Sequence, residues 1–161
     1  MTRAAPQRRT WPWFVGAGAV YTGTLVGTWW PRSGPTEVNL IPFRPHLRDL
    51  RRGARTPEAL RAWTDLVINV ALLMPAAFLL AQGFRRTRAA HSSVALTVVI
   101  GCAGSVVIEA GQVVIPGRVP DTTDVLLNSL GVGISSALVG LQERQQAPHQ
   151  SRLRHLAPPA R

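Results

Sequence analysis

Four apolar stretches follow one another along this 161-residue chain, and segments rich in charge and proline separate them. They cover residues 11–30, 66–84, 94–115 and 125–141. Each has the roughly 17 to 25 residues that a helix needs to cross a bilayer. Because a spanning segment must pair its backbone groups internally, the pattern predicts an all-α, polytopic membrane protein. We expect four transmembrane helices in an up-down bundle.

The first apolar stretch has tryptophan at both ends. Trp11 and Trp13 stand at its start, and Trp29 and Trp30 stand at its end. Indole rings prefer the headgroup level of a bilayer, so they indicate both membrane interfaces. The stretch is long for the apolar part of a signal sequence, and a retained helix is therefore expected.

The second span is expected to begin ahead of its apolar stretch. Thr56, Pro57 and Glu58 form a helix start signal, with threonine as the N-cap and proline at the first helical position. Inside the span, Pro75 has no amide hydrogen and leaves the carbonyl of Ala71 without its usual donor. A kink is therefore predicted in the middle of this helix.

The chain is strongly basic, and arginine supplies all of its basic residues. It has 18 basic residues against 8 acidic ones, and its formal net charge is +10. A nucleic-acid-binding protein can have this balance. Here, however, the arginines crowd between the apolar stretches and near the ends of the chain, as in membrane proteins. We expect membrane lipid as a partner and no nucleic acid.

The charged ends divide the chain into three parts. Residues 1–10 are expected to be a basic cytoplasmic tail, and residues 11–141 a single membrane domain. Residues 142–161 are polar and contain proline, so a disordered, basic cytoplasmic tail is expected there.

The orientation follows from the compact turn with Arg85, Arg86 and Arg88. Arginine concentrates in short loops on the inner side of a membrane. We therefore expect a multi-pass protein of the cell membrane with both termini inside. The loop 31–65 and the turn 116–124 then lie outside.

Four polar side chains interrupt the apolar spans near this outer face. Counting about 1.5 Å per residue, Glu109 lies roughly 9 Å from the end of its span. Gln112 lies one helical turn later, and Asn69 and Asn128 lie at shallow depths in the second and fourth spans. An intramembrane carboxylate is costly, so it indicates a functional site by default. The two asparagines could instead hydrogen-bond between helices.

The turn after Gln112 adds Arg118, Asp121 and Asp124 to the same face. Arginine binds phosphate or carboxylate with a planar fork. It could equally be a loop cation or pair with Glu109. The two aspartates could cap the fourth helix.

Metal or cofactor chemistry has little support in the sequence. Glu109, Asp121 and Asp124 could hold a divalent cation, but three acids without a defined geometry are a weak signal. No set of Cys and His ligands is present, and we expect no metal and no cofactor. His46 is expected to be a solvated loop residue.

Three blocks of the chain resemble the VanZ-like family of small membrane proteins. The first is NLIPF at residues 39–43, and the second, at residues 69–75, contains Asn69 and Pro75. The third runs over residues 109–133 and resembles the family pattern E-x-x-Q…R…D-x-x-x-N-x-x-G. The chain departs from the family at Ala76, where glycine is common. The resemblance covers about residues 11–141 and implies a protein of the bacterial envelope linked to teicoplanin resistance, without supplying a reaction.

We therefore expect an outer-face site that binds an anionic lipid-linked cell-wall precursor or a glycopeptide and lowers glycopeptide susceptibility. The expected binding residues are Glu109, Gln112, Arg118, Asp121, Asp124, Asn128, Asn69 and Asn39. One alternative is a membrane enzyme acting on a lipid phosphate, in which Glu109, with Asp124, would be catalytic. Another is a purely structural helix bundle.

Overall fold

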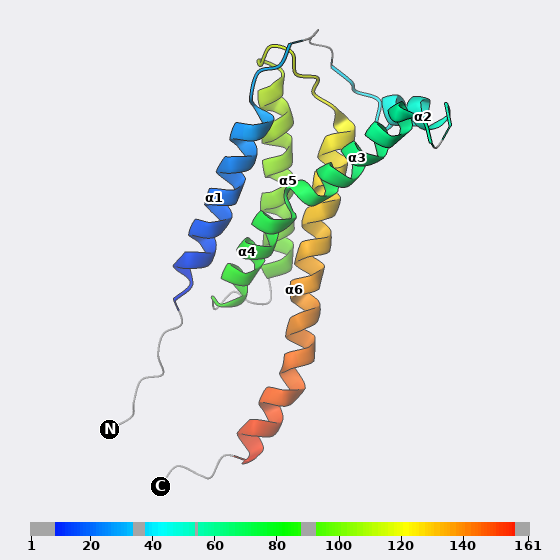
Figure 1. Ribbon diagram of the computed structural model, residues 1–161. Helices are drawn as coiled ribbons and strands as arrows, with labels where there is room; N and C mark the ends of the chain where they lie inside the picture. The colour runs from blue at the N-terminus through cyan, green and yellow to red at the C-terminus, as the bar shows by residue number, and fades with distance from the viewer. Residues whose placement is uncertain (1–8, 34–37, 54, 88–92, 157–161) are drawn as a thin grey trace.

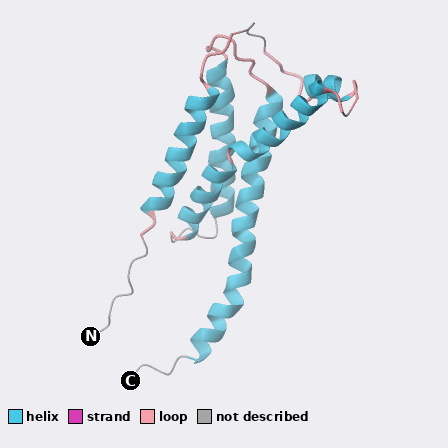
Figure 2. Ribbon diagram, in the orientation of Figure 1, coloured by secondary structure: helices cyan, strands magenta, loops and turns pink. Residues whose placement is uncertain are grey.

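The protein is all-helical in the computed structural model, which describes residues 9–33, 38–53, 55–87 and 93–156. Figure 2 draws no strand in these residues. The helices are α1 (Trp11–Thr28), α2 (Arg44–Leu50), α3 (Pro57–Leu72), α4 (Met74–Arg85), α5 (Ser93–Gln112) and α6 (Thr122–Leu156). Figure 1 shows α1, α4, α5 and α6 running side by side with alternating direction. The predicted all-α, up-down architecture is confirmed.

Three helical segments in the described residues are long and apolar enough to cross a membrane. They are Pro57–Arg85, which joins α3 and α4, Ser93–Gln112 and Thr122–Gln142. The first span is α1, which has 18 residues and no charge and lies beside α4 (Figure 1). Tryptophan, glycine and threonine make up much of its sequence.

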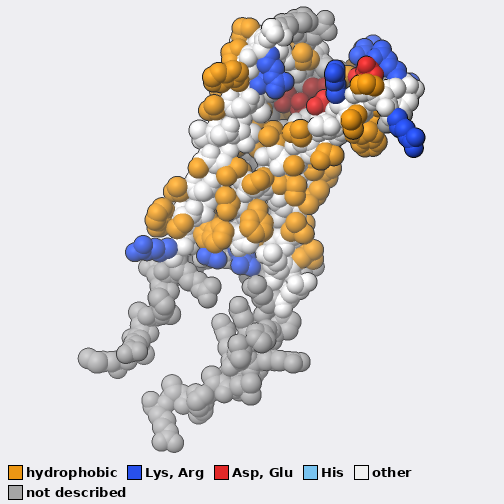
Figure 3. Space-filling model, in the orientation of Figure 1, with side chains coloured by type: hydrophobic (Ala, Val, Ile, Leu, Met, Phe, Trp, Pro, Cys, Tyr) orange, Lys and Arg blue, Asp and Glu red, His pale blue; other side chains and the backbone are white. Residues whose placement is uncertain are grey.

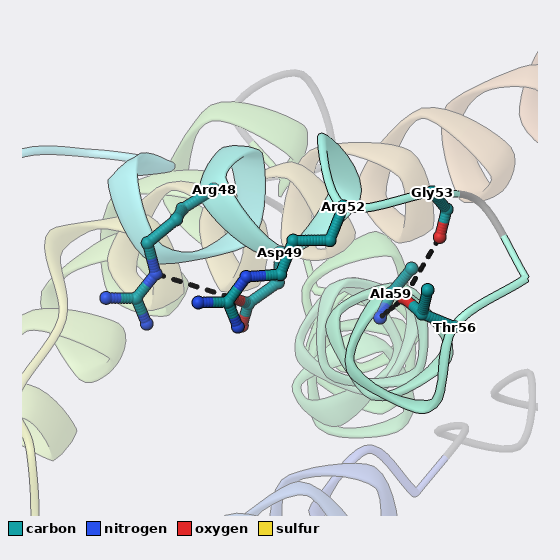
Figure 4. A network of polar contacts seen from close by, with 6 residues as sticks. All are labelled: Arg48, Asp49, Arg52, Gly53, Thr56 and Ala59. Carbon is teal, nitrogen blue, oxygen red and sulfur yellow. Dashed lines mark hydrogen bonds and ion pairs between the residues drawn. The ribbon is translucent and has the colours of Figure 1, made fainter.

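The second span begins and bends as its sequence predicts. Thr56 is the N-cap of α3, since its Oγ1 accepts a hydrogen bond from the Ala59 amide at 3.2 Å (Figure 4). The helix is interrupted at Leu73, and Pro75 lies in the first turn of α4. As a result α3 leans away from the bundle and carries α2 with it (Figure 1).

The fourth span is much longer than expected. Residues 142–156 continue α6 to Leu156, so the prediction of a disordered tail from residue 142 is wrong for this segment. Glutamine, glutamate and arginine follow the apolar stretch, and these residues favour helix as well as leucine does. Residues 157–161 lie outside the described part of the chain, as do residues 1–8 of the N-terminal tail and Arg88 of the basic turn.

The centre of the bundle is apolar. Leu73, Ala77, Ile108 and Val132 form its buried core, against which Tyr21 packs with other apolar side chains. Close approach of α3 to α6 depends on Gly131, where a Cβ atom would lie 1.8 Å from the Val70 carbonyl oxygen. This core supports the polar end of the bundle, described next.

Candidate functional site

A polar cavity of about 850 Å³ lies at the end of the bundle where α3 leans away from α1. Seven of the eight predicted site residues line it: Asn69, Glu109, Gln112, Arg118, Asp121, Asp124 and Asn128. Figure 3 shows acidic side chains gathered in a hollow between α1 and the α2–α3 arm, with arginines on either side. Hydrophobic side chains cover much of the surface below the hollow. The cavity therefore lies at the edge of the apolar belt.

Asp121 joins the turn to two other parts of the site. Its Oδ1 accepts a hydrogen bond from the Thr123 amide at 2.7 Å, so it caps the start of α6, as one of the predicted alternatives states. Its own amide donates to Oε2 of Glu109 at 2.9 Å. This bond holds the buried Glu109 carboxylate against the start of α6, where amide groups and the helix dipole favour a negative charge.

Asn39 is the predicted site residue that does not line the cavity. Its Nδ2 donates to Oδ2 of Asp121 at 2.7 Å, and its backbone forms an isolated parallel bridge with the same residue. Farther along the loop, the Phe43 amide donates to Oγ1 of Thr123 at 2.7 Å. The NLIPF segment therefore fastens the first loop to the start of α6 and supports the cavity from outside.

Arg118 is buried and bonded to the end of α1. Its Nε donates to the Trp30 carbonyl at 3.0 Å, and one terminal nitrogen donates to the Gly27 carbonyl at 2.8 Å. Among the described residues, the ion pairs within 4.0 Å are those of Asp49 with Arg48 and Arg52 (Figure 4). The alternative of an Arg118–Glu109 ion pair is therefore wrong, because the two side chains form no ion pair within 4.0 Å and the guanidinium instead donates to the Gly27 and Trp30 carbonyls.

The environment of Arg118 opposes its positive charge. Burial, and then the nearby charge of Arg32, lowers the pKa of Arg118 below its ordinary value. The position of Arg118 depends on Gly117, which has φ +73° and lies against the Arg32 carbonyl, where any Cβ would clash. A negatively charged group beside this guanidinium would stabilise its charged form.

The two asparagines of the spans play different parts. The Asn69 amide nitrogen donates to Oδ1 of Asp124 and so ties α3 to α6, as the interhelical alternative predicts. Asn128 is 1% exposed, and neither its Oδ1 nor its Nδ2 has a hydrogen-bond partner. A buried amide without partners costs about 1–3 kcal/mol. Asn128 therefore does not serve to link helices.

His46 was not among the predicted site residues, and its expected solvated position is wrong. It is 9% exposed, lines the polar cavity, and its Nδ1 is buried without a hydrogen-bond partner. The reason is that α2 packs against α3 and carries His46 over the cavity. Only the fold of the first loop reveals this position.

Two further residues that line the cavity could have been predicted from the helical period of the sequence. Asp65 and Arg61 line the cavity from α3. They lie one and two helical turns before Asn69, so the helical period places all three near one face.

Side chains of the types that bind metal ions also line the cavity. In the described residues, however, no group of three or more His, Cys, Asp or Glu is placed to hold a metal ion.

A bundle of membrane-crossing helices with a polar cavity at one end defines a polytopic helical membrane protein with a candidate binding site. The family model described as VanZ/LLP1 matches residues 14–142, and the chain belongs to this family. The match includes every residue of the candidate site, most of α1 and the whole of the other three spans. Comparison with curated proteins and with solved structures finds no match.

Proposed function

We propose that the polar cavity binds the headgroup of an anionic lipid-linked cell-wall precursor, or a glycopeptide, at the outer face of the cell membrane. Binding at this site would lower susceptibility to glycopeptides such as teicoplanin. The cavity volume of about 850 Å³ lies within the range of roughly 300–1,000 Å³ typical of small-molecule sites. Its place at the edge of the apolar belt suits a ligand that stays in the membrane.

The observation that carries this proposal is the free amide of Asn128. Both of its polar atoms are buried beside the cavity without a partner. His46 adds a second unpartnered, buried nitrogen from α2. Polar groups are seldom buried in this way unless something pairs with them. A ligand with hydroxyl, amide or phosphate groups supplies the missing partners.

The charges around the cavity suit a headgroup with both acidic and neutral polar parts. Arg32 and Arg61 line it and favour phosphate or carboxylate. Glu109 and Asp124 line it as well and can accept hydrogen bonds from hydroxyl and amide groups. Such a mixed lining fits a phosphate-linked sugar or peptide better than it fits phosphate alone.

The binding proposal has better support than either alternative. The enzyme hypothesis uses Arg118 to hold a phosphate, yet this guanidinium already donates to the Trp30 and Gly27 carbonyls. The structural hypothesis requires the buried polar groups to join helices. Asn69 does so, but Asn128 has no such bond.

Glu109→Gln tests the proposal, because it keeps the size of the side chain and removes the charge. The parent chain, expressed in a susceptible bacterium, is expected to raise the minimal inhibitory concentration of teicoplanin. Glu109→Gln is expected to lose that increase at an equal amount of membrane-inserted protein. The matched control is Glu58→Gln, which changes an exposed acid of α3 outside the cavity. Equal inhibitory concentrations for the parent and Glu109→Gln would contradict the proposal.

A second measurement separates binding from catalysis. Purified parent protein in lipid nanodiscs is incubated with radiolabelled lipid-linked cell-wall precursor. We expect the label to be retained on the protein and recovered unchanged. Recovery of a cleaved or transferred product would support the enzyme alternative.

A further inference from the structure

A second cavity, of about 270 Å³ and almost wholly apolar, lies within the membrane-crossing part of the bundle. We call it the apolar cavity. Small residues make the space, with Gly18 and Ala17 on α1, Ala76 on α4, and Gly101 and Gly104 on α5. Gly18 and Ile100 are exposed and mark its lipid-facing edge. No residue of the proposed polar site lines it.

The apolar cavity lies directly beneath the polar cavity on every helix that the two share. On α5 and α6 their nearest lining residues are four positions apart, on α1 they are two positions apart, and along the second span they are adjacent. The pairs, apolar cavity first, are Tyr21 with Gly23, Leu73 with Leu72, Gly104 with Ile108, and Val132 with Asn128. One helical turn rises about 5.4 Å, so the two spaces are stacked along the bundle axis.

From this stacking we infer that the two cavities bind opposite ends of one lipid, with the headgroup in the polar cavity and its hydrocarbon chain in the apolar cavity. The inference rests on the proposed function and narrows its ligand to a lipid-linked molecule. The apolar cavity is smaller than the roughly 300–1,000 Å³ of a complete ligand site, so it suits part of a ligand. Its lining is almost wholly apolar, so the cavity favours a hydrocarbon chain over a polar group.

The size of the apolar cavity also selects the kind of lipid. The space has room for one chain segment beside α1, and a diacyl lipid would bring two chains to the same place. We therefore assign the site to a polyprenyl diphosphate lipid, which has a single chain. The diphosphate would lie among the arginines of the polar cavity.

Gly18→Leu tests this assignment by adding a bulky side chain at the lipid-facing edge of the apolar cavity. Gly18 lies at the lipid-facing edge of this space, and a Cβ atom there meets nothing within 4 Å, so leucine fits at that edge without a clash. The matched control is Gly133→Leu, since a Cβ there also meets nothing within 4 Å and the residue lines neither cavity. Binding is measured in nanodiscs with a long-chain polyprenyl diphosphate and with isopentenyl diphosphate, whose chain is too short to fill the apolar cavity.

The parent is expected to bind the long-chain diphosphate more tightly than isopentenyl diphosphate. In Gly18→Leu the affinity for the long chain falls by about tenfold, the effect of excluding two methylene groups. Its affinity for isopentenyl diphosphate stays at the parent value, and Gly133→Leu behaves as the parent does. An unchanged preference for the long chain in Gly18→Leu would overturn the inference and leave the proposed function standing. If the parent binds neither diphosphate, the binding of anionic lipid-linked ligands in the polar cavity fails as well.

A second measurement needs no variant. A polyprenyl diphosphate with a photoreactive diazirine near the start of its chain is expected to cross-link to the α1 peptide containing residues 17–21. Excess diacyl phosphatidylglycerol should leave this cross-link in place. Cross-links confined to the outer surface of the bundle, or displacement by phosphatidylglycerol, would overturn the assignment.

Discussion

Two asparagines of the same chemical type have opposite surroundings at the polar cavity. Asn69 donates to Asp124 from the neighbouring helix, whereas Asn128 is 1% exposed and has no partner for either polar atom. Both were predicted as site residues from their place in apolar spans. The sequence could not predict which asparagine links two helices, because the answer depends on whether a carboxylate from another helix lies within reach of the amide.

This difference predicts opposite effects of the same substitution. Asn128→Leu removes an unpaired buried amide, which costs about 1–3 kcal/mol, and should raise the midpoint of thermal unfolding in detergent. Asn69→Leu leaves Asp124 without its hydrogen bond and should lower that midpoint. Asn128→Leu should also weaken ligand binding. A fall in the midpoint for both variants would show that the Asn128 amide has a partner.

At the scale of helices, signals within one stretch of chain predicted the starts of α3 and α6 and the bend of the second span, but not the end of α6 at Leu156. Thr56 caps α3, Asp121 caps α6, and the second span is interrupted beside Pro75. Capping and proline effects act within a few residues, so a single sequence is sufficient to predict them. The contact of α3 with α6 is different, because it depends on Gly131 against a carbonyl 61 residues earlier, that of Val70.

Gly131→Ala is expected to destabilise the bundle by roughly 1–3 kcal/mol, the usual cost of overpacking. The new Cβ atom would lie 1.8 Å from the Val70 carbonyl oxygen, so α3 must move away from α6. Gly133→Ala is the matched control on the same helix, since its Cβ meets nothing within 4 Å. The midpoints of thermal unfolding of the two variants are compared. Equal stability of both variants would show that α3 and α6 do not approach so closely.

For the whole molecule, the up-down order places the cavity and its supporting loops at one end and the Arg85–Arg86 turn at the other (Figure 1). The order was predicted from the four apolar stretches. The side of the membrane that each end faces was predicted from arginine placement alone, and it remains a prediction.

Cysteine labelling tests the orientation. In a Cys102→Ser background, Arg48→Cys on α2 is expected to react with a membrane-impermeant maleimide added to intact cells. Arg86→Cys is expected to react only after the membrane is opened. Both arginines are exposed, so access to the reagent depends on the side of the membrane. Labelling of Arg86→Cys in intact cells would reverse the proposed orientation.

The sequence alone determined that the protein is all-helical and has four spans. It also determined that Thr56 caps the second span, that Pro75 interrupts it, and that polar residues gather at one end of the bundle. These features follow from apolar length and from interactions within a few residues along the chain. Only the tertiary structure decided that Arg118 binds α1 carbonyls, that His46 is buried, that Asn128 lacks a partner, and that an apolar cavity underlies the polar one. Each of these depends on how segments far apart in the chain pack together, and no local pattern encodes that packing.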